Sequence, residues 1–144
     1  MSVIDDAITR LRYHALATKY DSSHNVNYAP DYPPEDGMMK KPFAITHIKG
    51  GEMDKHSWDV CRHIMQIGVD FHVSLDRLKV AYSQLDVIIP DFVNRLGGDP
   101  DLNASVDTIV FPLTYEVSPA QWNDVTTLMC AFNIPVKFIE DPTT

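Results

Sequence analysis

The chain has few cysteines, no long apolar run and a shortage of basic residues, and each shortage excludes a class of protein. Of its 144 residues only two are cysteines, Cys61 and Cys130, and neither belongs to a CxxC pair. We therefore expect two reduced, buried thiols rather than a disulfide or a thiol catalyst. No apolar stretch approaches the roughly 18 residues that a membrane span needs. The first residues lack a basic region and an apolar signal core, which predicts a protein that is not secreted.

Acidic residues outnumber basic ones, 20 against 12, and the formal net charge is −8. This balance argues against a protein that grips DNA or an acidic membrane through a basic face. It is compatible with a protein past which DNA slides, where repulsion is useful. The apolar fraction of 44% is sufficient for a real core. The length predicts a single domain over residues 1–144.

Sequence motifs for catalysis are missing. The chain contains no GxSxG, no P-loop, no GxGxxG after a strand and no HExxH. The pair Gly97-Gly98 lacks the lysine of a P-loop and is better interpreted as the end of a helix. We therefore predict no catalytic residues, no metal ligands and no cofactor.

Histidines and carboxylates near the middle of the chain leave an alternative open. Asp54, His56, Asp59 and His63 lie close in sequence, and carboxylate and imidazole groups together can bind Zn²⁺. A small metal-dependent enzyme that uses His56, Asp59 and His63 is one competing interpretation, against ordinary surface histidines at a polar hairpin end. A soluble ligand-binding domain, with one deep apolar pocket, is another.

The first forty residues predict one helix and one long loop. Residues 2–19 carry apolar residues at helical spacing, namely Ile4, Ile8, Leu11 and Ala15. Residues 20–41 are rich in proline, glycine and small polar residues, and they contain three tyrosines. Tyrosines on an irregular segment either anchor a partner or fix the loop to its own domain.

Two strands are expected next. Residues 42–49 have strand character, and Gly50-Gly51 predicts a break that opens a second loop over residues 50–58. Residues 59–73 show the clearest alternation in the chain, with Met65, Ile67, Val69, Phe71 and Val73 on one side. One apolar and one polar face are typical of a strand in an antiparallel sheet.

A helix is predicted after Ser74, which we expect to act as its N-cap. Its apolar stripe comprises Leu75, Leu78, Tyr82, Leu85 and Ile89. Pro90 predicts a break or kink, followed by a second helical piece over residues 90–96. Gly97-Gly98 should end that piece, because glycine takes the left-handed cap conformation easily.

The last third predicts a strand over residues 106–117, a turn over 118–124 and a final strand over 125–140. Pro112 suggests an edge position or a bulge, and Pro135 restricts pairing of the final strand. One face of that strand is apolar, with Leu128, Cys130, Phe132, Ile134, Val136 and Phe138. The predicted fold is therefore α+β: an antiparallel (mixed) four-stranded sheet with helices packed on one face, in the order α-β-β-α-(α)-β-β.

Four features in this order resemble the tail terminator (tail completion) family of long-tailed bacteriophages. They are the tyrosine- and proline-rich loop into Pro42-Phe43-Ala44-Ile45, the strand Met65–Val73 into Ser74-Leu75-Asp76-Arg77-Leu78, the segment from Arg95-Leu96 through Asp99-Pro100-Asp101-Leu102, and the Tyr115–Trp122 turn into a strand ending Val136-Lys137-Phe138. The chain departs from the family pattern at Asn103-Ala104, where family members often carry a glycine pair.

The resemblance implies a structural virion protein rather than an enzyme. Members of the tail terminator family form a ring, generally six-fold, on the last ring of the tail tube. The ring stops tube growth and provides the surface that joins tail to head, and DNA passes through its lumen. The implied partners are further copies of the chain, the tail tube protein and a head-side neck or connector protein, with assembly in the host cytoplasm. Another neck ring protein, such as a head-closure protein, or a minor tail protein is the alternative.

Two groups of residues are candidates for such an assembly. Candidates for protein–protein contact are aromatic or apolar and lie in expected loops or turns: Tyr20, Tyr28, Tyr32, Met53, Trp58 and Trp122. Candidates for a lumen that does not hold DNA are acidic: Asp99, Asp101, Asp107, Glu116 and Asp124.

Overall fold

The computed structural model describes residues 3–27, 29, 41–55, 61–122 and 125–140. Their order is α1 (Val3–Ala17), β1 (Phe43–Lys55), β2 (Cys61–Ser74), α2 (Leu78–Gly97), β3 (Thr108–Ile109), β4 (Thr114–Trp122) and β5 (Val125–Glu140). The strands form one sheet in the order β1-β2-β5-β3, and β4 also pairs with β5. Every pairing is antiparallel. The α+β prediction is confirmed, with five strands in place of four.

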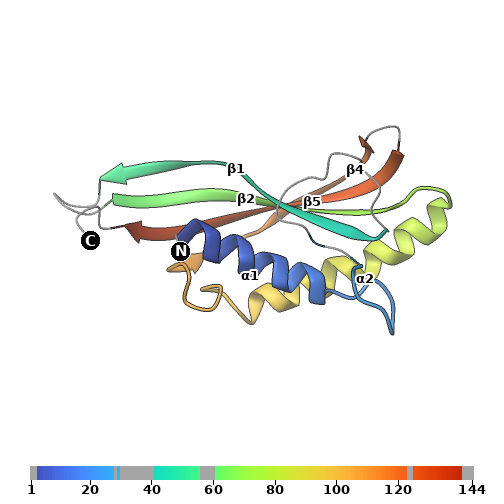
Figure 1. Ribbon diagram of the computed structural model, residues 1–144, viewed down its shortest axis with the longest axis horizontal. Coiled ribbons are helices and arrows are strands. Elements are labelled where there is room, and N and C mark those ends of the chain that lie inside the picture. The colour runs from blue at the N-terminus through green and yellow to red at the C-terminus, as the bar shows by residue number, and fades with distance from the viewer. Residues whose placement is uncertain (1–2, 28, 30–40, 56–60, 123–124, 141–144) are drawn as a thin grey trace.

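The two long strands β2 and β5 form the centre of the sheet, and their alternation is as predicted. Apolar residues that face each other across the pair, such as Val69 and Phe132, are fully buried. Both helices cover this side of the sheet (Figure 1). Phe92 of α2 packs edge-to-face on Phe71 and Phe132, with ring centroids 4.9 Å apart in each pair. Such aromatic pairs stabilise a contact by more than the apolar area they bury, so this cluster holds α2 against the sheet.

Helix α1 matches the predicted range 2–19 closely, but its buried face is rotated from the expected one. Ala7, Leu11, His14 and Ala15 are buried, while Ile4 and Ile8 are only partly buried against the core. Alanines allow the helix backbone to approach the sheet closely, and the larger isoleucines then lie at the margin of the contact.

Helix α2 differs from its prediction at its start and at Pro90. Ser74 still belongs to β2, and the residue before the helix is Arg77, which makes no side-chain cap. The helix passes through Pro90 without ending. A proline removes one backbone hydrogen bond. Ile88 and Phe92 lie on either side of it and are fully buried, so packing on the sheet keeps the helix intact.

The predicted apolar stripe of α2 is confirmed in part: Leu85 is buried, and Leu75 and Ile89 pack against the core while only partly buried. Leu78 and Tyr82 are about half exposed, and the buried residues are Ala81, Leu85, Ile88, Phe92 and Leu96. The helix does end at Gly97 as predicted. Gly98, however, has a φ of −86°, so the cap is right-handed and does not need glycine's conformational freedom.

Strand β1 continues through Gly50-Gly51, which the sequence predicted as a break. The register with β2 shifts by one residue between Ile48 and Gly50, and Gly50 has a φ of +152°. Gly51 leaves no room for a side chain, because a Cβ there would lie 2.7 Å from the Ile64 carbonyl oxygen. The glycines therefore form a β-bulge within a strand that reaches Lys55. Residues 56–58 of the predicted 50–58 loop lie outside the described residues.

The strand predicted over 106–117 is divided in two, and the predicted turn over 118–124 is mostly strand. β3 and β4 occupy successive parts of the same edge of β5, with Pro112 between them. Pro119 lies inside β4, opposite Leu128. An edge strand tolerates proline because it forms a ladder on one side only. The division accounts for the fifth strand.

The connection from α2 to β3 contains three consecutive residues with positive φ: Leu102 (49°), Asn103 (57°) and Ala104 (66°). Asparagine tolerates this region, whereas for alanine the left-handed conformation costs about 1–2 kcal/mol.

We predict that Ala104→Gly raises the free energy of unfolding by about 0.5–1 kcal/mol, because glycine removes the strain at this exposed site. Urea unfolding followed by circular dichroism measures the change. Asn103→Gly is the matched control and should have a smaller effect. An Ala104→Gly variant less stable than the parent chain would contradict the prediction.

Candidate interface surfaces

The side of the sheet away from the helices carries a polar ladder across β1, β2 and β5. Asn133 Nδ2 donates to Gln66 Oε1 at 2.7 Å, and His47 Nε2 lies 2.8 Å from Asp70 Oδ2. Gly68 provides the space for this pair, since a Cβ there would be 2.7 Å from His47 Nε2. We call this side the polar face.

One end of the polar face is buried, which the sequence did not predict. The rings of Phe43 and His72 stack with centroids 4.8 Å apart, and His72 Nδ1 lies 2.8 Å from Thr127 Oγ1. Burial lowers the pKa of His72 to about 4; the neighbouring Asp70 acts to raise it and Lys41 to lower it further. A neutral imidazole at this position is therefore part of the folded structure.

The fold should consequently lose stability in mild acid. His72 has a lowered pKa, so the stability it contributes is complete above pH 6.5 and disappears as the pH falls from 6.5 toward 4. The loss is about 2–3 kcal/mol. Urea unfolding at pH 7 and pH 4 measures it, and His72→Gln should make the difference between the two values smaller by that amount. An unchanged difference in the variant would show that another group is responsible.

Both edges of the sheet are exposed over short stretches. Residues 48–53 of β1 are exposed, with Ile48 at 50% and Met53 at 65% of their maximal area. On the opposite edge, residues 114–116 of β4 are exposed, and Tyr115 reaches 52%. Within the described residues no further strand pairs with either outer edge. Unpaired edge strands offer backbone donors and acceptors to another chain.

Asp99, one of the acidic lumen candidates, forms an ion-pair cluster within the subunit. Its Oδ2 accepts hydrogen bonds from Arg10 Nε at 2.7 Å and from His14 Nε2 at 2.6 Å, and its Oδ1 accepts from the Asn103 N–H at 2.8 Å. Burial acts to raise the pKa of the Asp99 carboxyl, but the bonds from His14, Arg10 and Asn103 outweigh it and hold the pKa at about 2. The cluster joins α1 to the connection between α2 and β3.

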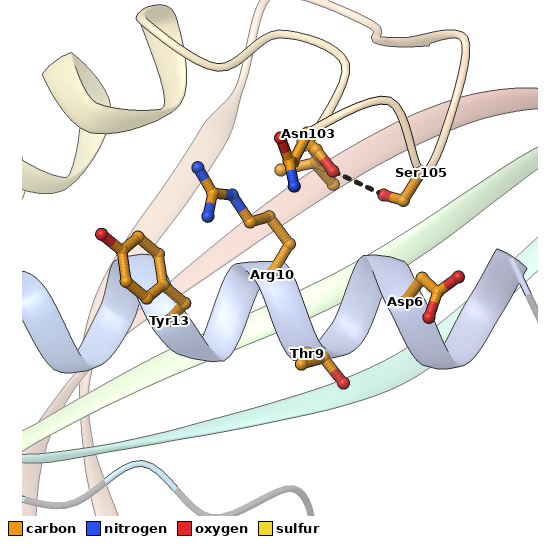
Figure 2. A pocket seen from close by; sticks show the side chains of 7 residues that line it. Asp6, Thr9, Arg10, Tyr13, Asn103 and Ser105 are labelled. Carbon is orange, nitrogen blue, oxygen red and sulfur yellow. Dashed lines mark hydrogen bonds between the residues drawn. The ribbon is translucent and has the colours of Figure 1, made fainter. Parts of the chain in front are cut away.

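A shallow groove of about 420 Å³ lies beside this cluster. It is lined by side chains of α1 and of the α2–β3 connection: Asp6, Thr9, Arg10, Tyr13, Leu102, Asn103 and Ser105. Figure 2 shows the Arg10 guanidinium between Tyr13 and Asn103. The guanidinium carbon is 4.5 Å from the centre of the Tyr13 ring, a cation–π contact. The ion pairs and the cation–π contact stabilise the packing of α1 on this connection.

Asp99→Asn should lower the free energy of unfolding by about 2–3 kcal/mol, because Arg10 and His14 lose their charged acceptor in a mostly buried site. Asp101→Asn, at an exposed position nearby, is the matched control and should change it by less than about 0.5 kcal/mol. Urea unfolding at pH 7 measures both. Because the pKa of Asp99 is lowered, the stability that its carboxylate contributes is lost as the pH falls from 3.8 to 2. This pH range lies below the range in which His72 loses its contribution. Equal effects of the two variants would contradict the structural role.

The remaining acidic candidates do not gather in one place. Asp101 and Asp107 are exposed in the α2–β3 connection, and the Asp107 N–H donates to the Lys137 carbonyl. Glu116 is exposed on β4 opposite Ala131, six residues away from Lys137 along β5. Asp124 lies outside the described residues.

The aromatic and apolar candidates are also dispersed. Tyr20 packs against the core and stacks on His24 with centroids 5.8 Å apart, so it fixes its segment to the domain. Met53 is exposed on β1. Trp122 is the last residue of β4 and pairs with Val125, but its side chain is not among those that the structure describes. Tyr28, Tyr32 and Trp58 lie outside the described residues.

Sequence reasoning missed several exposed apolar side chains. Tyr13 and Leu16 project from α1, and Tyr115 projects from β4; each is about half exposed. The alternation of β4 could have placed Tyr115 on the same side as Val117. Tyr115 is exposed because β4 lies at the edge of the sheet, and the position of β4 is known only from its pairing with β5.

Of the three residues that the metal-dependent enzyme interpretation requires, the structure describes only one. His63 stacks on Phe138 with centroids 4.6 Å apart, while His56 and Asp59 lie outside the described residues. Within the described part of the chain no group of three His, Cys, Asp or Glu side chains could hold a metal ion. Both cysteines are free; Cys130 is buried as expected and Cys61 only half-buried. Burial, with a smaller effect of Asp70, raises the pKa of Cys130 to about 12.

Comparison of the chain with protein-family models and with curated protein sequences finds no match. None of the helices in the described ranges has the length and apolar character needed to cross a membrane.

Proposed function

We propose that this chain is a structural subunit that assembles with copies of itself into a ring, and that the ring caps a bacteriophage tail tube. The observation that carries the proposal is the presence of two exposed sheet edges on opposite sides of one subunit. Different surfaces on opposite sides are what a heterologous, ring-closing contact requires. The ordered features that resemble tail terminators give the ring its place on the tail.

The polar face supports this proposal through its balance of charge. Its ladder consists of a neutral amide pair and a histidine–carboxylate pair, and the other charged residues of this side carry both signs, as at Lys137 and Glu116. Duplex DNA binds tightly to proteins that neutralise many of its phosphates. A net charge of −8 and a face without a basic stripe suit a surface that DNA passes without being held.

The proposed role is structural rather than catalytic. Two of the buried histidines make contacts within the fold: His72 contacts Thr127, and His14 contacts Asp99. A tail-end ring also requires contacts with the tube below and the head-side connector above. Exposed apolar side chains on the helices, such as Tyr13 and Tyr82, are available for these contacts.

The decisive experiment mixes the purified chain with tail tubes that lack their end ring. We expect negative-stain images in which one end of each tube carries an additional layer of constant thickness, and tubes that no longer elongate when tube protein is added. Tubes with unchanged ends and continued growth would reject the proposal. Binding to the head-side connector but not to tubes would instead favour a head-closure ring.

A further inference from the structure

The direction of the strands determines how the two exposed edges can meet. Successive strands in the order β1-β2-β5-β4 are antiparallel, so β4 runs opposite to β1. If a second copy is placed beside the first in the same orientation, its β4 therefore lies antiparallel to β1. The helices of both copies then remain on the same side of a continuous sheet. Strand addition of this kind gains backbone hydrogen bonds without rearranging either copy.

Apolar side chains of the two edges lie on the same side of the sheet. Ile48 pairs opposite Ile67, and Tyr115 pairs opposite Phe132, and both of these partners belong to the buried, helix-covered side. Ile48 is 50% and Tyr115 is 52% exposed. Contact between an aromatic and a β-branched side chain across antiparallel strands stabilises a sheet.

Charges of opposite sign lie on the other side of the same two edges. Lys49 extends over Gly68 on the polar face, where its Cδ is 3.0 Å from the position of a Gly68 Cβ. Glu116 pairs opposite Ala131, on the polar face as well. Lys49 and Glu116 are therefore exposed charges of opposite sign, each next to the exposed apolar residue of its edge; the further charge of the β1 stretch, Glu52, lies beyond the Gly50 bulge.

The two exposed stretches are also at nearly the same level along the strands. Ile48 lies across from Ile67, which lies across from Ile134 on β5, whereas Tyr115 lies across from Phe132. The offset between the edges is thus two residues of β5, or about 7 Å of strand rise. A stagger between neighbouring strands is what the closure of a sheet into a ring requires.

Structural interruptions limit the contact to this short stretch. On β1 the bulge at Gly50 shifts the register, and on the opposite edge Pro112 separates β3 from β4. Bulges and prolines prevent long, unspecific pairing between edge strands. The remaining free segments are those that carry Ile48 and Tyr115.

We propose that β1 of one subunit pairs with β4 of a second copy, with Ile48 directly opposite Tyr115 on the helix side. In this register Lys49 lies diagonally across from Glu116 on the polar face, a separation that long side chains can span. The proposal rests on the ring assembly put forward above and specifies its subunit contact. It makes the ring wall a continuous antiparallel sheet.

Disulfide trapping between two variants, each with one exposed cysteine besides the buried Cys130, tests the contact. In a Cys61→Ser background we mix Ile48→Cys with Tyr115→Cys under mild oxidation. Residues directly opposite in an antiparallel pair are 4.5–5.5 Å apart at Cα, roughly the span of a disulfide. We expect a covalent dimer in the mixture and at most a tenth as much with either variant alone. Tyr82→Cys, about as exposed but on α2, replaces Tyr115→Cys as the matched control and should give no dimer.

A chain that carries both Ile48→Cys and Tyr115→Cys should give a ladder of covalent oligomers that ends at one closed species. No dimer in the mixture would overturn the proposed contact, and so would equal dimer yields from the single variants, because these indicate pairing of like edges. Circular dichroism of each variant verifies folding, and Ile48→Ser and Tyr115→Ser, folded but without a thiol, complete the controls.

Charge reversal provides the second test, at positions exposed in the single subunit. Lys49→Glu and Glu116→Lys should each reduce the yield of trapped dimer by about tenfold through like-charge repulsion, and the double variant should restore it. No recovery in the double variant would overturn the pairing of Lys49 with Glu116. The ring function and this contact can fail separately: capped tubes without trapping reject only the contact, whereas trapping without capping rejects only the tail-end role.

Discussion

The structure depends on the antiparallel pairing of β2 with β5. The whole of β2, 14 residues, is in register with β5, and alternate residues of both strands point to the helix side. Because this pair lies in the centre of the sheet, its apolar residues on the helix side, such as Ile67, Val69 and Ile134, are fully buried. The rings of Phe71 and Phe132 then provide the surface on which Phe92 holds α2. Burial of this kind is the dominant favourable contribution to folding.

The helices occupy only one side of the sheet, and this asymmetry has structural consequences. The covered side is stabilised by packing, whereas the polar face is stabilised by cross-strand pairs such as His47 with Asp70. The outer strands lack neighbours within the described residues and leave Ile48 and Tyr115 half exposed. A subunit built in this way resembles a section of a larger sheet, and the proposed assembly starts from this observation.

The charged groups that the sequence makes conspicuous serve several purposes. Asp99, Asp101 and Asp107 lie in the same connection, yet among them only Asp99 accepts hydrogen bonds from Arg10 and His14. Asp101, two positions later, is exposed. The N–H of Asn103, which lies in the positive-φ turn that follows, also donates to Asp99. Neighbours in sequence therefore have unrelated roles, and the acidic candidates could not be assigned by composition.

The sequence by itself determined the α+β class, the extent of α1 and β5, and the faces of β2 and β5, because alternation and helical spacing reflect burial directly. Only the tertiary structure decided the rest. Pro90 stays within a helix because Ile88 and Phe92 are anchored on the sheet, and Gly50-Gly51 forms a bulge because β2 continues beside it. The exposed edges at Ile48 and Tyr115 were not predictable either, since exposure depends on which strand lies at the margin. Strand order is set by contacts between residues distant in the chain, and no local pattern records them.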